Sequence, residues 1–597
     1  MTFQILFVLI LILSLGALLI SERLRPDVGA LLLLVILGLT GLVSAGELFS
    51  GFSRSAVITI IALFIITRAL EQTGATRVLG QHLNRLAGGK EARAILVIMV
   101  ATALLSLVMN TIAAAAVLLP AVIGITRQSD LQPSKLLIPL SFAALLGGMA
   151  TVYTTANILV SSALAEQGFQ PYGVLDFIPV GLPMGIAGIL FIVFFGRRLL
   201  PEHGLGGEKG PRRVNQSLSD TYKLADSVNA VYVIPGSGMA GLSLVDGGWG
   251  QILGLNVVGI SRGGKVTLAP SQSEEVIEGD VILFTGPLDE QTARRYGLFF
   301  TDDPDWKGQF ISEQISLVEV VLAPRSKIAG KTLRDIHFRE KFELSIIAIW
   351  REGTIIREKL ANIPLKFGDT LLLQGSHARI NLLRKEPDFL VLEEDIAPIA
   401  SPKKALLAVG LTSAAMLLPA FNVLPIAEAA FAAATFLVVF NCVDMDDAYA
   451  SIEWKAVFLI SGMLPLGTAM ANTGTAAFLG NLLIGVLGRL GPLAIAGGIF
   501  ILTTLLTQVM SGQATAVILA PIAIAASQGV GVDPRSMAMA VAMGCSMAFL
   551  TPFGHATNLL VMGPGGYTVK DYTRVGWPLS LILFVVMLAS LYLFWGI

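Results

Sequence analysis

Residues 92–125 read ARAILVIMVATALLSLVMNTIAAAAVLLPAVIGI, an apolar block that is too long for one membrane span of about 20 residues. Two polar residues, Asn110 and Thr111, interrupt it in the middle. A second long block, 490–527, is interrupted in the same way at 511–513. Non-helical backbone at membrane depth is tolerated only where it is buried in protein or lines a cavity. Each block therefore predicts two short helices that meet at a polar tip, which is a re-entrant hairpin.

The other apolar blocks predict full membrane spans on both sides of a charged middle region. Hydrophobic residues make up 54% of the chain and charged residues 14%, against about 45–50% and about 25% in soluble domains. A net charge of −1 argues against a nucleic-acid partner. Because no basic residue precedes the first block, we expect a retained span and not a cleaved signal peptide. The blocks are 3–21, 28–44, 56–70, 137–163 and 177–195, then 405–418, 426–442, 456–471, 537–562 and 578–594.

The two apolar halves are copies of one another. Ala56, Ala69 and Thr73 recur at 456, 469 and 473, and further along the offset grows by one, so that Asn157 matches Asn558. Each half has an odd number of full spans and one hairpin. With both tethers of the middle region on one side, the halves must have opposite orientations. Inverted repeats are typical of secondary transporters, whose sites lie near the midplane at broken helices. The sequence therefore predicts an α-helical polytopic membrane protein of two inverted repeats with an inserted α+β region.

Basic residues assign the sides of the membrane. The predicted loops on the side of the middle region carry most of the loop Lys and Arg residues. The opposite loops, at 44–54, 165–173, 421–428, 472–489 and 528–536, carry only Arg54, Arg489 and Arg535. By the positive-inside rule the insert is cytoplasmic and both termini face outward, in a bacterial-type inner membrane. The acidic inside loop at 443–455 does not change this, because acidic residues contribute little to topology. The predicted domains are membrane repeat 1 at 1–200, soluble modules at 201–300 and 301–402, and membrane repeat 2 at 403–597.

The middle region also contains a repeat. VGISR at 258–262 recurs as IAIWR at 347–351, and EGDVILFTG at 278–286 recurs as FGDTLLLQG at 367–375. Short β-branched runs around Gly-Asp turns predict two small α+β units. These segments resemble the TrkA-C (RCK-C) module of potassium-transport regulators, with an unknown small ligand as a further partner. The Gly-rich turn PGSGMAG at 235–241 matches a dinucleotide fingerprint, but poor helix formers follow it, so we expect a plain turn and no organic cofactor.

Polar residues at the tips and in the span after each hairpin form the candidate site. They are Asn110, Thr111, Thr154 and Asn157 in the first half and Ser511, Gly512, Gln513, His555, Thr557 and Asn558 in the second. Hydroxyl and amide oxygens suit an alkali cation, and helix N-termini at the tips suit an anion. The alternative is structural, because Ser and Thr bond their own helix and Asn joins helices. For His555, substrate contact and a helix–helix hydrogen bond stay equally open.

The stretch TPFGHATNLLVMGPGGY at 551–567, followed by RVGWP at 574–578, resembles the divalent anion/sodium symporter family of the ion transporter superfamily. TrkA-C-like modules between two membrane halves are similar to its sulfate-permease branch. The resemblance implies sodium-coupled uptake, a homodimer and an elevator-type movement. It implies cation sites at Asn110, Thr111, Thr154 and Asn157 and at Ser511, Gln513, Thr557 and Asn558, with the anion at Asn110, Thr111, Ser511, Gly512, Gln513 and His555.

The leading hypothesis is sodium-coupled symport of sulfate, with di- and tricarboxylates as the second substrate class. The second tip, 511–513, departs from the family's Ser-Asn-Thr, so the substrate and the second sodium site stay open. A proton- or sodium-coupled anion antiporter and a non-transporting anion sensor are the alternatives. Asp and Glu are almost missing from the spans, which argues against a carboxylate proton relay. No H-E-x-x-H, P-loop or G-x-S-x-G occurs in the sequence, and we expect no enzyme activity.

Overall fold

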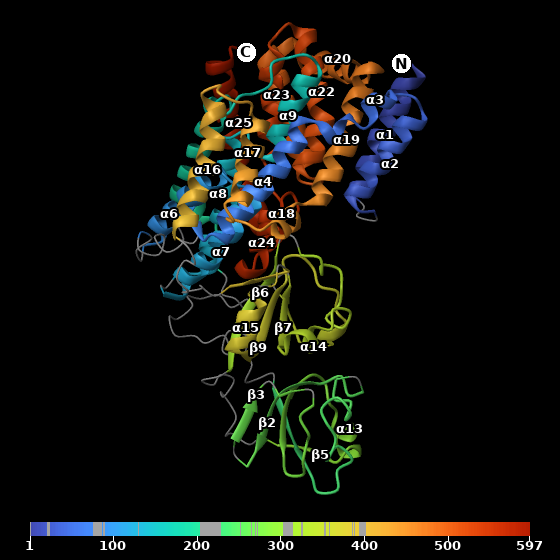
Figure 1. Cartoon of the computed structure of the whole chain (residues 1–597), viewed down its shortest axis with the longest axis vertical. Helices are drawn as coiled ribbons and strands as arrows, with labels where there is room; N and C mark the ends of the chain where they lie inside the picture. Colours follow the sequence, from blue (N-terminus) through green and yellow to red (C-terminus); the bar gives the residue numbers. More distant parts are fainter. Residues whose placement is uncertain are drawn as a thin grey trace.

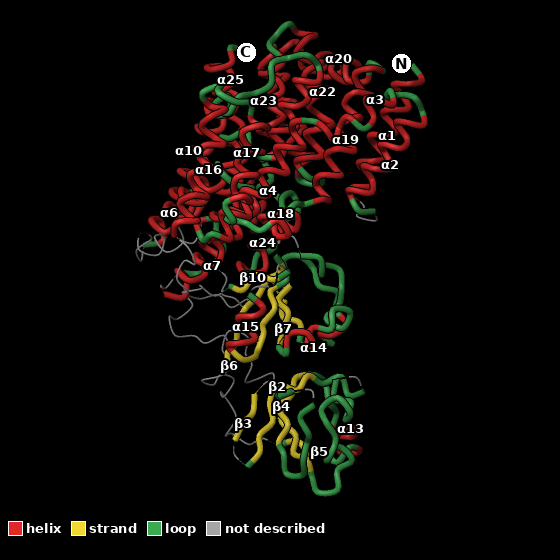
Figure 2. The backbone as a smooth tube through the Cα atoms, viewed as in Figure 1, coloured by secondary structure: helices red, strands yellow, loops and turns green. Residues whose placement is uncertain are grey.

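The computed structural model describes residues 2–20, 24–75, 86, 90–128, 131–202, 228–250, 252–263, 265–268, 270–271, 273–301, 315–323, 326–351, 354–357, 359–384, 386, 388–392 and 402–597. Figure 1 shows a helical region that holds both ends of the chain and, projecting from the opposite end, an insert built on two β-sheets. Figure 2 shows the same division, with red helices above yellow strands. Leu79 and Gly80, which the repeat matches with Leu479 and Gly480, lie outside the described residues.

The first helical half follows the apolar blocks of the sequence. The block at 92–125 is two helices, and the break between them falls at Asn110, as the polar tip predicts. The block at 137–163 is also divided, because residues 150–154 form no helix. The helices are α1 (Phe3–Ile20), α2 (Pro26–Leu39), α3 (Ala45–Leu48), α4 (Ser55–Gln72), α6 (Glu91–Ser106), α7 (Thr111–Gln128), α8 (Pro133–Met149), α9 (Thr155–Glu166) and α10 (Ile178–Phe194).

The second half has elements in the same order. They are α16 (Pro402–Ala420), α17 (Ile426–Val439), α18 (Met445–Ser451), α19 (Trp454–Asn472), α20 (Thr475–Leu487), α21 (Pro492–Thr507), α22 (Gly512–Val530), α23 (Pro534–Cys545), α24 (Ala556–Gly565) and α25 (Val569–Trp595). The expectation of a plain outside loop at 472–489 is wrong, because most of it is α20. This helix is apolar and packs against α22, which gives it a buried face.

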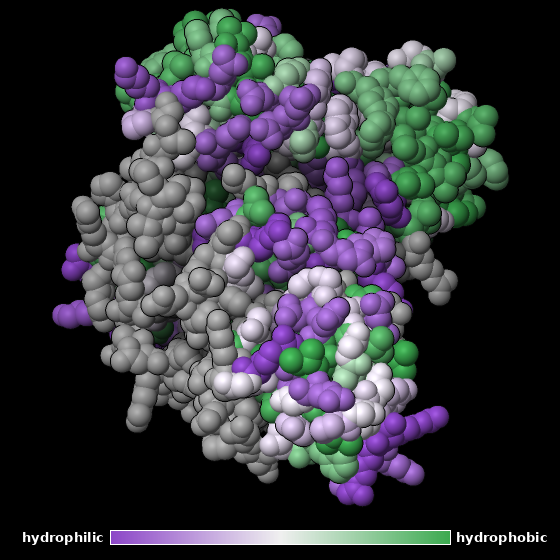
Figure 3. Space-filling view, turned by 60° about the horizontal axis from the view of Figure 1, so that its bottom comes forward, coloured by the Kyte–Doolittle hydropathy of each residue, from purple (hydrophilic) through white to green (hydrophobic). Residues whose placement is uncertain are grey.

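Five described helices are long and apolar enough to cross a membrane alone, namely α4, α16, α19, α22 and α25, and eight other apolar helices are shorter. Large apolar side chains are exposed on the outer helices, including Leu13, Leu39 and Leu593. Figure 3 shows green apolar surface at the upper left and upper right of the helical region with purple surface between them, whereas the insert in front mixes purple, white and green. Exposed apolar surface of this extent marks contact with lipid or with another protein. The chain is therefore an integral membrane protein.

Helices from the two halves interlock around one apolar core. α2 packs on α19 and α4 packs on α17, so the early helices of each half contact those of the other. In the same way, α7 packs on α24 and α9 packs on α22. Buried side chains from both halves form one continuous cluster, with Phe142 of α8 against Phe549 at 4.8 Å between ring centroids. Neither half could bury these faces alone.

The insert consists of two units with the same strand order. The strands are β1 (Asn229–Val233), β2 (Asn256–Arg262), β3 (Lys265–Leu268), β4 (Val281–Thr285) and β5 (Leu298–Phe300), then β6 (Ile315–Leu322), β7 (Ser345–Arg351), β8 (Thr354–Ile356), β9 (Thr370–Ser376) and β10 (Phe389–Val391). The sheet orders are β3-β2-β4-β1-β5 and β8-β7-β9-β6-β10, read in matching directions. We call these units module 1 and module 2. Turns follow β1 at 235–242, as predicted for the Gly-rich segment.

The Arg and Asp of the repeated motifs form the same ion pair in both modules. Arg262 donates to both carboxylate oxygens of Asp280 at 2.9 Å, and Arg351 donates to those of Asp369 at 2.8 and 2.6 Å. The carboxylate of Asp369 is buried and also accepts from the backbone N–H of Lys366 at 2.8 Å. A bidentate pair of this kind fixes the Gly-Asp turn against the neighbouring strand.

Replacing Asp369 by Ala is expected to destabilise module 2 by about 3–5 kcal/mol, because it leaves the guanidinium of Arg351 without its partner in a mostly buried site. Thermal unfolding of the purified full chain measures the effect. Glu290→Ala is the control, since it removes only an exposed helix pair with Arg294. Equal melting curves for the two variants would show that the pair does not hold the turn.

Candidate functional site

The two hairpin tips place polar residues at the starts of helices. The Oδ1 atom of Asn110 accepts from the backbone N–H of Ile112 at 2.9 Å, just before α7. The Oγ atom of Ser511 accepts from the N–H of Ala514 at 3.4 Å, at the start of α22. Both residues therefore cap their helices, which is the structural part of their role. The remaining free N–H groups of these first turns still favour a negative charge nearby.

The predicted Asn pair lies at two helix breaks and makes matching contacts there. Asn157, fully buried in α9, donates its amide to the carbonyls of Gly148 at 3.3 Å and Thr151 at 2.6 Å. Asn558, fully buried in α24, donates to the carbonyls of Ala548 at 2.6 Å and Thr551 at 3.2 Å. Each amide thus holds the backbone of its own break. We name these breaks the α8–α9 break and the α23–α24 break.

Oxygen atoms gather beside the α8–α9 break. A methyl group at Gly148 would lie 3.3 Å from Oγ1 of Thr111, 3.7 Å from Oγ of Ser106 and 2.9 Å from Cγ2 of Thr154. The side-chain amide of Asn157 donates to the backbone carbonyl of the same glycine. The first tip and the α8–α9 break therefore meet here, and we call Ser106, Thr111, Thr154 and Asn157 the first oxygen cluster.

Two oxygens of the first oxygen cluster lack a donor. Oδ1 of Asn157 and Oγ1 of Thr154 are buried and accept no hydrogen bond from any described residue. Buried polar atoms are almost always paired, so an unpaired one calls for an explanation such as a bound ion or water. Amide and hydroxyl oxygens are hard ligands that suit an alkali cation. The donor set of this cluster therefore fits sodium, without help from a carboxylate.

The second half differs at the equivalent position. Oδ1 of Asn558 accepts from the hydroxyl of Ser141 in α8 at 2.5 Å, so this oxygen already has a partner. Thr557 is fully buried, and its N–H donates to Nδ1 of His555 at 3.2 Å. Gln513 lies in the first turn of α22, and its side chain forms no hydrogen bond with a described residue. The structure therefore does not join Gln513 to Asn558.

His555 caps its own helix. Its Nδ1 atom lies 2.9 Å from Oγ1 of Thr557 and accepts from the N–H of that residue. The helix–helix hydrogen bond that the sequence left open is not formed by this nitrogen. His555 is of intermediate exposure as a residue and lies at the end of the α23–α24 break, two positions after the exposed Phe553. Substrate contact remains a prediction for His555.

Two residues that hold the backbone of the α23–α24 break were not predicted from the sequence. Gln508, near the second tip, donates to the carbonyls of Thr504 at 2.9 Å and Met547 at 2.8 Å, and its Oε1 accepts from Leu550 at 3.2 Å. Ser141 is the second, through its bond to Asn558. For Gln508, a usable signal was a glutamine within an apolar block, three residues before the polar tip at Ser511. No sequence signal connects Ser141 to a residue of the other half.

Glycines let neighbouring helices touch both breaks. A side chain at Gly181 of α10 would collide with the carbonyl of Met149, the last residue of α8, and with Ala150 in the α8–α9 break. A side chain at Gly576 of α25 would collide with the carbonyl of Phe549 in the α23–α24 break. The backbone of each break is therefore packed directly against a helix backbone. This packing keeps the non-helical segments away from lipid, as membrane depth requires.

The sequence of this chain is similar to those of known transporters. A family described as "CitMHS: Citrate transporter" matches residues 17–544. The uncharacterized transporter YfbS of Escherichia coli (strain K12) is 33% identical over 96% of this chain and 97% of its own length. Sodium/sulfate cotransporter 2 of Chlamydomonas reinhardtii is 28% identical over 45% of this chain and 32% of its own length. The sodium-dependent dicarboxylate transporter SdcS of Staphylococcus saprophyticus is 31% identical over 24% of this chain and 27% of its own length.

Proposed function

Because the chain belongs to the CitMHS citrate transporter family of the ion transporter superfamily, we propose that it is a secondary active transporter that couples sodium entry to the uptake of a divalent anion, with sulfate as the leading substrate. The family that matches is the citrate transporter family. The predicted resemblance to divalent anion/sodium symporters is supported by two relatives whose names describe sodium-dependent transport. Sodium is accordingly the coupling ion in this proposal.

One observation carries the proposal. The buried oxygens of Asn157 and Thr154 lack donors, beside Thr111 at the first hairpin tip. A sodium ion held there supplies the positive charge that the neutral site needs before a dianion can enter. The protein's part is to hold the carbonyls of the break in place through the Asn157 amide. The anion would then lie between the two tips, near His555, facing the N-termini of α7 and α22.

Carboxylates are the second substrate class. The family description is citrate transport, and the relative SdcS is named for dicarboxylates. Sulfate is placed first because the sulfate-named relative covers the larger share of this chain, 45% against 24%. The second tip, 511–513, is the segment that would decide between them, since its sequence departs from the expected pattern.

The proposal includes two inverted repeats. Helices from both repeats form each of two groups, which move relative to one another. Matching helix contacts in the two halves, α7 with α24 and α22 with α9, support the repeat. The break-bearing helices pack mainly on the hairpin helices, α8 on α6 and α23 on α22, whereas α2 packs on α19 and α16 on α17, which supports a site-bearing group that moves against a scaffold. A homodimer assembled through the scaffold completes this elevator-type mechanism. The soluble modules belong to the TrkA-C type in the same proposal.

Both termini are proposed to face outward and the insert to face the cytoplasm. The position of the insert at the end of the molecule opposite to N and C supports opposite sides for them (Figure 1). We expect Glu290→Cys in module 1 to react with an impermeant maleimide only from the cytoplasmic side. Thr2→Cys is the matched control and should react only from outside. Cys442 and Cys545 are buried, which keeps the background low. Reversed labelling of both positions would invert the topology.

Radiolabelled sulfate uptake into proteoliposomes, with and without an inward sodium gradient, tests the function. Sodium-dependent uptake that excess succinate leaves unchanged is the expected result. Uptake that succinate abolishes would move the substrate to the carboxylates. Uptake that ignores sodium but stops with a proton ionophore would favour the antiporter, and no flux from a folded protein would favour a sensor.

A further inference from the structure

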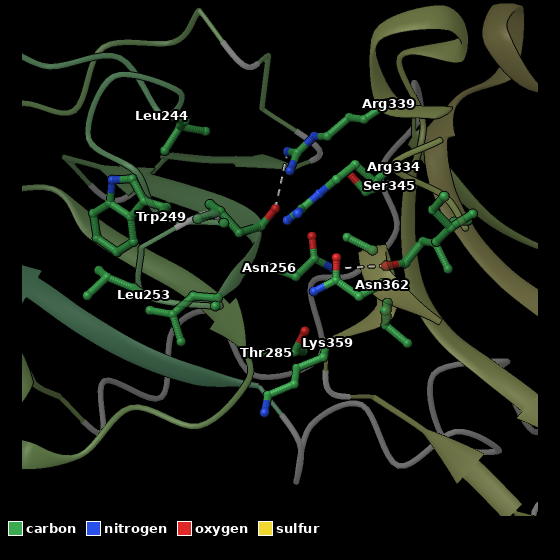
Figure 4. Close-up of a pocket in the computed structure, with 18 of the residues that line it drawn as sticks. Leu244, Trp249, Leu253, Asn256, Thr285, Arg334, Arg339, Ser345, Lys359 and Asn362 are labelled. Carbon is green, nitrogen blue, oxygen red and sulfur yellow. Dashed lines mark hydrogen bonds between the residues drawn. The ribbon is translucent and has the colours of Figure 1, made fainter. Parts of the chain in front are cut away.

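A cavity of about 600 Å³ lies between the two modules of the insert. This volume falls in the range of small-molecule sites, about 300–1,000 Å³. Figure 4 shows one wall with apolar side chains of module 1, among them Leu244, Trp249 and Leu253. The facing wall belongs to module 2 and carries Arg334 and Arg339, which reach toward the middle of the cavity. One side is therefore apolar and the other is cationic.

Arg339 is a largely buried cation without a carboxylate partner. Its guanidinium donates across the cavity to the carbonyls of Val257 at 3.4 Å and Pro270 at 3.2 Å. It forms no ion pair with any acidic residue that the structure describes, and burial lowers the pKa of Arg339 below its usual value. Buried guanidinium groups are ordinarily paired with an anion. This one has only two neutral acceptors.

The other charged groups at the cavity add to this imbalance. Arg334 and Lys359 form no ion pair with a described acidic side chain, and both are available to a ligand. Glu340 is the one acidic residue among the described lining residues, and it pairs with His337 at 3.1 Å. The cavity therefore has an excess of positive charge that nothing within its described lining neutralises.

Two further features lie in the same place. The hydroxyl of Thr285 is buried and has no hydrogen-bond partner among the described residues. Lys359 and His337 both have left-handed backbone conformations, with φ of 50° and 48°. Such conformations are strained for residues other than glycine, and they gather at ligand sites because the strain holds side chains in position. Both residues line the cavity.

We propose that this cavity binds a small organic anion, with a phosphate or carboxylate group held by Arg334 and Arg339 and with Lys359 adding positive charge at another edge of the cavity. The rest of the ligand lies against Leu253 and the exposed Ile252 on the wall of module 1. A simple inorganic anion would leave the apolar wall exposed, so the ligand carries an apolar or aromatic body. The site stands independently of the transported substrate.

The cavity is connected to the candidate transport site by β7. This strand begins at Ser345, which lines the cavity, and its Trp350 pairs with Thr370 of β9. The turn before Thr370 contacts α24, because a side chain at Gly563 would collide with the carbonyl of Gly368 and lie 2.7 Å from Oγ1 of Thr370. α24 also carries Asn558. Ligand binding would therefore act on the α23–α24 break, a consequence that rests on the proposed function.

Isothermal titration calorimetry on the purified full chain tests the site. Phenyl phosphate is the probe, because it joins a dianion to an aromatic ring, and inorganic phosphate is the reference without the ring. We expect saturable binding of phenyl phosphate at least about ten-fold tighter than that of inorganic phosphate. Phthalate, with two carboxylates on the same ring, decides which anionic group is preferred. Absence of binding by both aromatic probes would overturn the proposal.

Variants locate the binding. The double substitution Arg334→Gln with Lys359→Gln should weaken binding at least about ten-fold, or about 1.4 kcal/mol. Lys331→Gln is the matched control, since Lys331 is an exposed cation of module 2 outside the cavity. Equal affinity in the double variant and the wild type would place the ligand elsewhere and overturn the assignment.

Sodium-driven sulfate uptake provides the second readout. Probe that binds the wild type should change the uptake rate there and leave the double variant unchanged. An unchanged rate in the wild type at saturating probe would overturn the connection through β7. If no uptake occurs with or without probe, the transport function fails, and the calorimetry still decides the ligand site.

Discussion

Asn157→Ala is expected to lower sodium-dependent anion uptake by at least about 100-fold. The substitution removes the unpaired Oδ1 oxygen and also the amide that holds the carbonyls of Gly148 and Thr151. Losing buried hydrogen bonds of this kind costs about 1–3 kcal/mol each, and the break then no longer presents its oxygens together. Initial uptake rates as a function of sodium concentration measure the loss.

Two further variants are needed to interpret the effect of Asn157→Ala on uptake, one as a control and one at the repeat-related asparagine. Asn472→Ala replaces an exposed asparagine at the end of α19 and should leave uptake near the wild-type rate. Asn558→Ala should also abolish coupled uptake, because it frees the break at 548–551 and leaves Ser141 without its acceptor. Wild-type sodium dependence in a folded Asn157→Ala protein would remove this residue from the cation site.

Gly576→Ala is expected to disrupt the α23–α24 break. The added carbon would collide with the carbonyl of Phe549, so the α23–α24 break must shift. Overpacking of this kind destabilises by about 1–3 kcal/mol, and here the displaced backbone is that of the site. We expect uptake to fall at least about ten-fold, together with a lower melting temperature.

Gly410→Ala is the matched control for that substitution. Gly410 lies within α16, and a methyl group there meets no atom within 4 Å. Alanine is the better helix former by about 1 kcal/mol, so this variant should be as stable as the wild type or slightly more stable. If both alanine variants transport and melt alike, close packing of α25 on the break is not required.

The hairpins were predictable because their signal is local. A block too long for one span, with Asn110 or Ser511 in the middle, leaves few alternatives, and the helices do end there. The apolar blocks likewise gave most helices, and the repeated Gly-Asp motifs gave the two β units. In each case, residues close in sequence contain the information. The exception is α20, an apolar helix in a segment that was predicted to be an outside loop.

Contacts between distant segments could not be predicted from the sequence. The bond between Ser141 and Asn558 joins residues 417 positions apart, and nothing in either segment names the other. The pairing of Asn157 with Asn558 did follow from the repeat, but their difference did not. One oxygen lacks a donor and the other accepts from Ser141, because the residue of α23 equivalent to Ser141 is Ala542, which has no hydroxyl. The cavity between the modules arose from docking of two units, which no motif encodes.

Sulfate accumulation in proteoliposomes, driven by an imposed sodium gradient at clamped membrane potential, tests the central claim most directly. We predict accumulation above the external sulfate concentration that collapses when a sodium ionophore dissipates the gradient and is lost in Asn157→Ala. Accumulation that is indifferent to the sodium gradient, or that persists unchanged in Asn157→Ala, would contradict sodium-coupled symport through the first oxygen cluster.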